Sequence, residues 1–221
     1  MKELYFSRQS LEQQAFEIYQ QVIKISQSKK IPYRLQKSAL LVLDMQEYFL
    51  VPASHAYIPS AEAIVEGINR LIEAYFSHKR PIIFTQHLNT LGNAGMMSTW
   101  WKDMITAQSA FHRIIPEIDV TKGRVILKSQ YDAFYQTELQ EVLQKAEVEQ
   151  LVICGVMTHL CCETTARSAF MRGYEVFFPV DGTATYNRDF HRASLINLAH
   201  GFAEVLLVKD ILEAIWGDHE S

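Results

Sequence analysis

The chain alternates between short apolar runs and segments whose apolar residues recur at helical spacing. The apolar runs cover residues 38–43, 81–85, 125–127, 150–154, 174–180 and 203–208. The helix-like segments between them cover residues 61–78, 137–146, 161–172 and 191–200. Tight hairpin signals are few, so neighbouring runs are expected to pair in parallel through helical crossovers. The pattern predicts a three-layer, doubly wound α/β domain with a six-stranded parallel sheet.

The strands and the N-terminal segment add two expectations. The strand runs are continuously apolar instead of alternating, which is typical of strands covered by helices on both faces. Before the first run, residues 1–37 hold one amphipathic helical pattern, formed by Leu11, Ala15, Ile18, Tyr19, Val22 and Ile25. We therefore expect a helical arm over residues 1–37 that packs outside the sheet, and a single α/β domain over residues 38–221.

Composition narrows the class of protein. The 221 residues are 48% hydrophobic and 21% charged with a net charge of −4, as in an ordinary globular domain. This balance favours neither nucleic acid nor an anionic membrane as partner. The opening residues lack the apolar core of a signal peptide, and no apolar run approaches the roughly 18 residues of a membrane span. A cytoplasmic protein acting on a small molecule is expected.

Candidate chemistry is sought where the predicted strands end, because parallel sheets place ligands at the carboxyl edge. Asp44, His87, Lys128 and Asp181 stand at or near such ends, as does the segment GVMTHLCC. The glycine-rich phosphate-binding motifs and the GxSxG elbow of serine hydrolases are absent from the sequence. The sequence therefore contains no motif that would indicate a dinucleotide-binding protein, a nucleoside triphosphatase or a serine hydrolase.

Cys161 is the candidate nucleophile. It follows a buried run and a short loop and opens a helical pattern, where the helix dipole is expected to lower the thiol pKa. The alternative is a small buried residue, which most free cysteines are. Metal binding by His159, Cys161 and Cys162 is disfavoured, because adjacent cysteines do not easily face one tetrahedral ion. Three cysteines within nine residues are expected to be reduced thiols.

Asp44 and Lys128 are the expected partners of this thiol. Each ends an apolar strand, in ALLVLD and RVILK, where an unpaired charge would be costly. A carboxylate, an ammonium and a thiol at one sheet edge can move a proton from Cys161 to Asp44 while Lys128 balances the charge. The alternative interpretations are a structural salt bridge or helix cap for Asp44 and a snorkelling strand-end lysine for Lys128.

Three segments in this order, LVLDMQEYF, VILKSQYDAF and GVMTHLCCETTARSAF, resemble the isochorismatase-like hydrolase superfamily. That superfamily includes nicotinamidases and N-carbamoylsarcosine amidohydrolases, and the resemblance runs from about residue 38 to about residue 209. It implies a Rossmann-like fold, with Asp44 as general acid/base, Lys128 as the catalytic lysine and Cys161 as nucleophile. It also implies a cis peptide between Val156 and Met157, and an oxyanion hole formed by the N–H groups of Met157 and Cys161.

Departures from the family pattern bear on the reaction. Nicotinamidases carry a metal-binding Asp-x-His where this chain has Thr85, Gln86 and His87, so neither a metal nor another cofactor is implied. Isochorismatases have HxGC where this chain has HLCC, which places a thiol at Cys161 and favours cleavage of a carbon–nitrogen bond in a small amide. Cysteine-independent opening of a vinyl ether by Asp44 stays open, as does a non-catalytic binding module.

The remaining predictions concern the pocket and the assembly. The long stretch from residue 87 to residue 119 is interpreted as a lid or an interface. The residues expected to bind substrate are Phe49, His87, Trp100, Tyr131 and Phe134. Residues expected to serve structure are Cys154 and Cys162 in the core, Glu163 with Arg167 as a helical ion pair, and Asp181 as a loop brace. A homodimer or homotetramer is expected from the resemblance.

Overall fold

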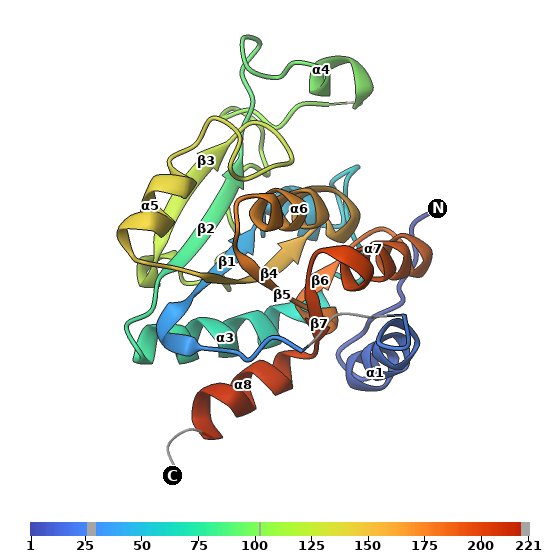
Figure 1. Ribbon diagram of the computed structural model, residues 1–221. Helices are drawn as coiled ribbons and strands as arrows, with labels where there is room; N and C mark the ends of the chain where they lie inside the picture. Colours follow the sequence, from blue (N-terminus) through green and yellow to red (C-terminus); the bar gives the residue numbers. More distant parts are fainter. Residues whose placement is uncertain (26–29, 102, 218–221) are drawn as a thin grey trace.

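A parallel sheet lies between two layers of helices in the computed structural model, which describes residues 1–25, 30–101 and 103–217 (Figure 1). Within these residues the strands are β1 Ser38–Leu43, β2 Ile82–His87, β3 Arg124–Lys128, β4 Gln150–Val156, β5 Glu175–Pro179, β6 Thr183–Ala184 and β7 Glu204–Leu206. Six of them run in the order β3-β2-β1-β4-β5-β7, and the two-residue β6 pairs with β4. The predicted doubly wound α/β fold is confirmed.

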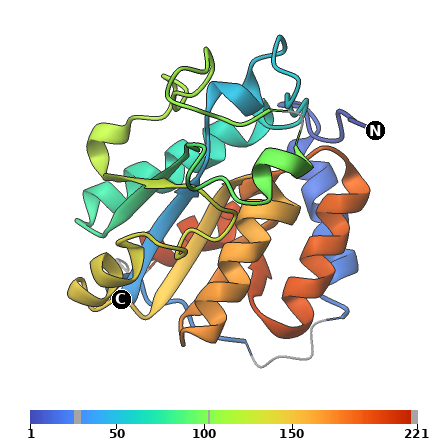
Figure 2. The same ribbon diagram turned by 90° about the horizontal axis from the view of Figure 1, so that it is seen from above.

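Helices cover both faces of this sheet. They are α1 Leu11–Val22, α2 Glu47–Leu50, α3 Val65–Ser77, α4 Met97–Trp100, α5 Leu139–Lys145, α6 Glu163–Met171, α7 Arg188–Gly201 and α8 Val208–Gly217. Figures 1 and 2 show α5, α6 and α7 on one face and α3 with α8 on the other. Within the described ranges, each helix is too short or too polar to cross a lipid bilayer.

The N-terminal helix α1 packs against the domain itself. It contacts α7 and β7, and its inward side chains Ala15, Ile18 and Val22 are fully buried. Ahead of it, Tyr5 and Phe6 are also buried, and the backbone N–H of Glu3 donates to the Tyr186 carbonyl. The arm therefore covers hydrophobic surface at the β7 side of the sheet.

Strand β3 corrects one expectation about the sheet. Its continuous apolar run predicted burial on both faces, but Val125 is 38% exposed and Leu127 is 58% exposed. Strand β3 lies at the edge of the sheet and pairs only with β2 among the described strands. The helices that cover the sheet do not extend fully over this edge strand, so one of its faces is exposed to solvent.

Gly155 brings the ends of the two central strands unusually close. It has a φ of 109°, and a Cβ placed there would lie 2.1 Å from the carbonyl oxygen of Leu43. Because only glycine combines this conformation with this approach, β4 can pair with β1 up to Leu43. The residues that follow these two strands, Asp44 and Met157, are thereby held at the same edge.

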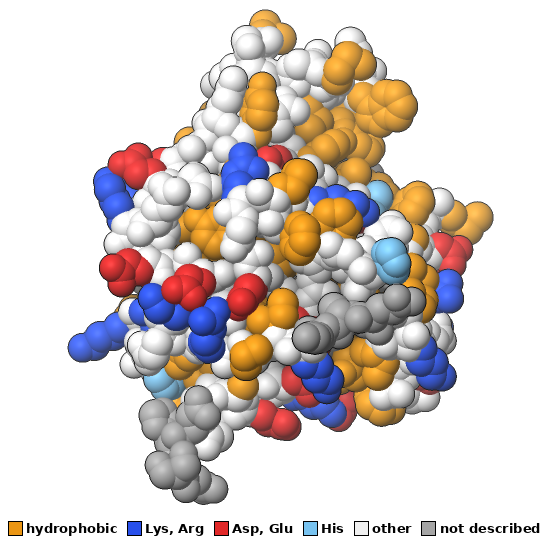
Figure 3. Space-filling view, viewed as in Figure 1, with side chains coloured by type: hydrophobic (Ala, Val, Ile, Leu, Met, Phe, Trp, Pro, Cys, Tyr) orange, Lys and Arg blue, Asp and Glu red, His pale blue; other side chains and the backbone are white. Residues whose placement is uncertain are grey.

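The segment between β2 and β3 projects from that same edge. It carries the short helix α4, which Figure 1 shows standing away from the body of the domain. Figure 3 shows apolar side chains gathered over this projection. Leu91, Met96 and Trp100 are the exposed large hydrophobic residues in it, with Trp100 73% exposed.

Candidate active site

Asp44, Lys128 and Cys161 meet at the carboxyl edge of the sheet. Asp44 follows β1, Lys128 is the last residue of β3, and Cys161 lies in the π-helical turn Thr158–Cys162 between β4 and α6. Lys128 Nζ lies 2.8 Å from Asp44 Oδ2 and 3.2 Å from Cys161 Sγ. A carboxylate oxygen of Asp44 and Cys161 Sγ lie within 4.8 Å of each other. The three groups are close enough to exchange a proton.

Strand register explains the placement of Asp44. The last residue of β1, Leu43, pairs with Thr85 of β2. The Thr85 hydroxyl consequently donates to Asp44 Oδ1 at 2.7 Å, and the Asp44 N–H points back to the same hydroxyl oxygen at 3.2 Å. Asp44 has a φ of 52°, an uncommon conformation outside glycine that turns the chain sharply after the strand. Thr85 therefore fixes one carboxylate oxygen and leaves the other facing Lys128.

The pKa values of the ion pair follow from its burial. Burial alone would raise the pKa of Asp44, but the ammonium of Lys128 together with hydrogen bonding to the carboxylate outweighs burial and lowers it. Burial would lower the pKa of Lys128, but the Asp44 carboxylate and then Cys161 outweigh it and raise the pKa. Both groups are therefore charged at neutral pH.

The thiol of Cys161 departs from the expectation drawn from its place at a helix start. Burial raises its pKa to about 12, the negative charge of Asp44 adds to the rise, and Lys128 opposes it. The expected lowering by the helix dipole is wrong, because desolvation of a thiolate outweighs a helix terminus in this enclosed position. Cys161 is a thiol at rest, and a base has to remove its proton when it attacks.

The turn that carries Cys161 begins at a cis peptide between Val156 and Met157, as the family resemblance predicted. Met157 and Cys161 both line the pocket described below. The Met157 carbonyl accepts from the N–H groups of Leu160 and Cys162, which holds the turn together. The side chain of Thr158 lies 3.0 Å from Nδ1 of the buried His191 and ties the turn to α7.

His87 lies beside Lys128 because the two residues are paired in register across β2 and β3. Its Nδ1 is 3.3 Å from Lys128 Nζ, and its Nε2 is 2.9 Å from Asn89 Oδ1. Burial, then the neighbouring ammonium, lowers the pKa of His87 to about 4, so the imidazole is neutral. The sequence pointed to His87 as a pocket residue but not to its contact with Lys128.

Asp44, His87 and Cys161 hold ligand atoms within 4.8 Å of one another, a spacing that suits a metal ion. The ammonium of Lys128, however, lies against all three of these ligand atoms. A divalent cation would meet a fixed positive charge there and compete with it for the same lone pairs. The group fits an ammonium better than a metal. His159, from the other metal hypothesis, is directed instead to the Thr185 hydroxyl at 2.5 Å and stacks on Phe190.

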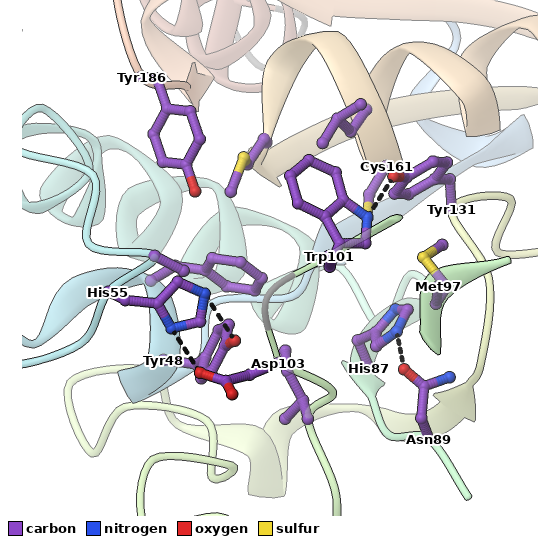
Figure 4. A pocket seen from close by; sticks show the side chains of 15 residues that line it. Tyr48, His55, His87, Asn89, Met97, Trp101, Asp103, Tyr131, Cys161 and Tyr186 are labelled. Carbon is purple, nitrogen blue, oxygen red and sulfur yellow. Dashed lines mark hydrogen bonds and ion pairs between the residues drawn. The ribbon is translucent and has the colours of Figure 1, made fainter. Parts of the chain in front are cut away.

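A pocket that is partly open to solvent lies next to the Cys161 thiol (Figure 4). Its walls are mostly aromatic and apolar. They are formed by Tyr48, Phe49, Ala56, Met97, Trp101, Ile105, Tyr131, Met157, Leu160 and Tyr186, and the polar lining is His55, His87, Asn89, Asp103 and Cys161. Walls of this kind favour contact with a flat, largely apolar ring.

The structure brings some of the expected binding residues to this pocket and not others. Phe49, His87 and Tyr131 line it. Trp100 does not line it and points to solvent from α4, whereas the next residue, Trp101, donates from Nε1 to the Tyr131 hydroxyl at 2.7 Å. Phe134 lies in the core instead, where it stacks on Tyr174.

A second polar group lies across the pocket from Cys161. Asp103 Oδ2 is 3.0 Å from His55 Nδ1, and His55 Nε2 is 3.2 Å from the Tyr48 hydroxyl (Figure 4). The His55 side chain is 32% exposed, so this cluster sits at the pocket mouth. Tyr48, His55 and Asp103 form what we call the mouth cluster, which can hydrogen-bond the distal end of a bound molecule.

Several structural roles expected from the sequence are confirmed. Cys154 and Cys162 are fully buried, and Arg167 donates to Glu163 at 2.7 Å. Asp181 Oδ1 accepts from the Val208 N–H at 2.7 Å, at the start of α8. It therefore braces the loop after β5 against the start of α8.

Other residues of the site were missed in the sequence. Thr85 could have been found from the sequence, because it is a polar residue near the carboxyl end of an apolar run, where site residues are expected. Trp101, Asp103 and the residues around His55 lie in loops with no local periodicity, so no sequence pattern places them. Tyr186 lines the pocket from the loop before α7, and its carbonyl accepts from the N–H of Glu3 in the N-terminal segment.

Comparison with known proteins extends these observations. The family model described as the Isochorismatase domain matches residues 38–210. The chain is 38% identical over 186 residues to Nicotinamidase 3 of Arabidopsis thaliana, covering 82% of this chain and 90% of that protein. It is 31% identical over 185 residues to enterobactin synthase component B of Escherichia coli, covering 81% of this chain but only 64% of that protein.

Structural comparison gives the same result. The crystal structure of a cysteine hydrolase from Pseudomonas syringae superposes with a TM-score of 0.81 at 25% identity, covering 85% of this chain and 96% of that one. The resemblance seen in three sequence segments is thus confirmed over nearly the whole domain. The chain belongs to the isochorismatase-like hydrolase family.

Proposed function

We propose that this protein is a cysteine-dependent amidohydrolase that cleaves the carbon–nitrogen bond of a small planar carboxamide. The observation that carries the proposal is the contact of Lys128 with both Asp44 and Cys161, in a buried cluster that opens onto an aromatic pocket. The identity with Nicotinamidase 3 supports an aromatic carboxamide such as nicotinamide as the first substrate to test.

The first half of the reaction forms a thioester. Asp44 takes the proton of the Cys161 thiol as Sγ attacks the carbonyl carbon, and the carbonyl oxygen becomes an oxyanion. The backbone N–H groups of Met157 and Cys161 stabilise this oxyanion. Asp44 then gives the proton to the amide nitrogen, the carbon–nitrogen bond breaks, and ammonia leaves. The raised pKa of Cys161 requires this concerted proton removal, since little thiolate exists at rest.

The second half consumes water. Asp44 takes a proton from a water molecule as its oxygen attacks the thioester carbonyl, and the carbon–sulfur bond breaks. The departing sulfur recovers the proton from Asp44, and the carboxylic acid product is released. Lys128 remains an ammonium throughout and balances the charge on whichever of Asp44 and Cys161 is negative.

The pocket supports a planar substrate with a second polar end. Aromatic walls favour a flat ring, and the mouth cluster can hydrogen-bond a ring nitrogen or a polar substituent. Nicotinamide and benzamide differ only in the ring nitrogen, so their ratio of kcat/KM measures this contribution. We expect nicotinamide to be the better substrate by about tenfold, the effect of one good hydrogen bond.

The decisive experiment compares wild type with Cys161→Ala. Ammonia release from nicotinamide should be lost in the variant, and a quenched wild-type reaction should yield an acyl adduct on the Cys161 peptide by mass spectrometry. Unchanged melting temperature in Cys161→Ala serves as the folding control. Ammonia release that persists in the variant would remove the covalent mechanism.

A second candidate is the hydrolysis of a vinyl ether of the isochorismate type, with Asp44 as proton donor and no covalent step. The raised pKa of Cys161 favours it, because a resting thiol is not itself a nucleophile, whereas the lowered pKa of Asp44 opposes it, because an ionised carboxylate has no proton to donate. In that case Cys161→Ala should retain turnover of isochorismate and Asp44→Ala should lose it. A non-catalytic binding module would leave both substrates unchanged.

A further inference from the structure

Lys128 has more hydrogen-bond acceptors around it than it has donors. Its ammonium carries three N–H groups. Four acceptor atoms surround it. Three of them, the Gln130 carbonyl oxygen at 2.9 Å, Cys161 Sγ at 3.2 Å and His87 Nδ1 at 3.3 Å, are in hydrogen-bonding geometry, whereas Asp44 Oδ2 at 2.8 Å is an ion-pair contact that takes no hydrogen bond in this arrangement. Two of these acceptors, Asp44 and Cys161, exchange a proton during the reaction proposed above. The other two, Gln130 and His87, do not.

The tautomer of His87 can be assigned from its neighbours. Asn89 Nδ2 donates to the backbone carbonyl of Ser129 at 2.9 Å, and a carbonyl can only accept. The amide of Asn89 is therefore oriented with Oδ1 toward His87 Nε2, 2.9 Å away. Since Oδ1 also only accepts, Nε2 carries the proton. The lone pair of the neutral ring then lies on Nδ1, the nitrogen that faces Lys128.

The backbone of His87 is fixed as firmly as its ring. Its N–H donates to Gln46 Oε1 at 2.8 Å, and its carbonyl accepts from Gln46 Nε2 at 3.1 Å. Gln46 is itself fully buried. The charged and titratable groups that face His87 are Lys128 on β3, Asp44 after β1 and Cys161 on the turn after β4.

We propose that His87 is a positioning residue for Lys128: its Nδ1 lone pair and the Gln130 carbonyl hold two of the three ammonium N–H groups. The third N–H then alternates between Asp44 and Cys161 as the proton moves between them. Asn89 acts on Lys128 only through His87, because its hydrogen bond selects the histidine tautomer with an unprotonated Nδ1. This role rests on the proposed amidohydrolase function and assigns to His87 a task beyond lining the pocket.

Rescue by a conservative variant tests the role of the lone pair. His87→Leu removes the acceptor, and its kcat should fall by about 10- to 100-fold while KM changes by less than about threefold, as expected for one hydrogen bond to a charged group. His87→Gln offers a carbonyl oxygen to Lys128 and should keep kcat within about fivefold of wild type. Equal losses in both variants, or a loss confined to KM, would overturn the proposal.

The pH profile of Asn89→Asp provides an independent test that does not remove the histidine. A carboxylate at this position still accepts from Nε2 but favours the imidazolium, which has no lone pair on Nδ1. The acidic limb of kcat should therefore move upward by at least about one pH unit, with activity recovering as the pH rises. Asn93→Asp is the matched control, since this exposed loop residue adds the same charge and keeps its bond from the Thr90 N–H.

A spectroscopic measurement distinguishes this proposal from the function beneath it. The ¹⁵N shifts of His87 in the wild-type protein should identify Nε2 as protonated and Nδ1 as unprotonated at pH 7; the opposite tautomer would overturn the positioning role. This readout holds even where a variant fails to fold. Activity that survives in Cys161→Ala would instead contradict the amidohydrolase mechanism and leave the tautomer result unchanged.

Discussion

Lys128 Nζ lies 2.8 Å from Asp44 Oδ2, and neither side chain is exposed to solvent. Desolvation makes such a pair costly to build, and replacement by apolar residues is often neutral or stabilising in other proteins. Buried ion pairs with perturbed pKa values cluster at functional sites for this reason. In the proposed reaction the pair serves the proton transfer at Cys161.

Removal of one partner should be strongly destabilising. Lys128→Met leaves the Asp44 carboxylate buried without a counter-charge, so the free energy of unfolding in urea should fall by about 3–5 kcal/mol. The double variant Asp44→Asn with Lys128→Met restores neutrality and should recover most of that loss without recovering turnover. A single variant as stable as wild type would contradict the burial of a true ion pair.

The ion pair should stabilise the fold across a wide pH window. The pKa of Asp44 is lowered, so its contribution is present above the ordinary carboxyl value and is lost as pH falls through the folded value. The pKa of Lys128 is raised, so its contribution is present below the ordinary lysine value and is lost as pH rises through the folded value. The coupling energy from the double-mutant cycle should thus be flat between about pH 5 and pH 9. A bell-shaped dependence centred inside that window would disagree.

Asp44→Asn should change turnover and thiol reactivity in opposite directions. In the proposed mechanism the Asp44 carboxylate is the base for Cys161. Burial is the largest cause of the raised Cys161 pKa, the charge of Asp44 is the next, and Lys128 acts to lower that pKa. Without the carboxylate, hydrolysis should be lost, but the rate of Cys161 alkylation by iodoacetamide at pH 8 should increase. Peptide mass spectrometry identifies the modified residue, and slower alkylation in the variant would show that Asp44 activates the resting thiol.

Trp100 and Trp101 form a matched pair of tests for the pocket wall. Trp101 lines the pocket and donates to the Tyr131 hydroxyl, so Trp101→Phe should raise KM by about 3- to 30-fold with a smaller change in kcat. Trp100 is largely exposed on α4, so Trp100→Phe should leave both constants within about twofold. Steady-state kinetics of both variants test this prediction. A larger rise in KM for Trp100→Phe than for Trp101→Phe would mean that the segment between β2 and β3 covers the substrate differently.

Asp181 predicts a separate, structural pH effect. Burial raises its pKa to about 6, so the folded state binds the proton more tightly than the unfolded chain. Its contribution is therefore present below the ordinary carboxyl value and is lost as pH rises through 6. Asp181→Asn keeps an acceptor for the Val208 N–H without the charge, and it should exceed wild type in stability at pH 8 by at most about 3 kcal/mol. The two proteins should differ less at pH 4 in thermal melts.

Much of the fold could be predicted because apolar runs and helical spacing are local properties of the chain. The run over residues 38–43 matches β1. Because the carboxyl ends of parallel strands share one edge of the sheet, the sequence also predicted that Asp44 and Lys128 lie close together. Helix α8 was missed although Val208, Ile211, Leu212 and Ile215 have helical spacing, because the same residues adjoin the last strand run.

Tertiary structure alone decided the electrostatics of the site. The sequence placed Cys161 at the start of a helix, which favours a lower pKa, but the depth of its burial beside Asp44 reversed the sign. Burial depends on what every other segment contributes around the thiol, and no local pattern encodes it.

The pocket walls were decided in the same way. Periodicity could not tell Trp100 from Trp101, since the direction of a side chain in an irregular loop is set by its distant contacts, here with Tyr131. The register of β2 against β3 likewise placed His87 next to Lys128. By itself the sequence determined which reactive groups reach the sheet edge, because strand ends are local. Their distances, tautomers and charge states depended on packing between strands far apart in the chain.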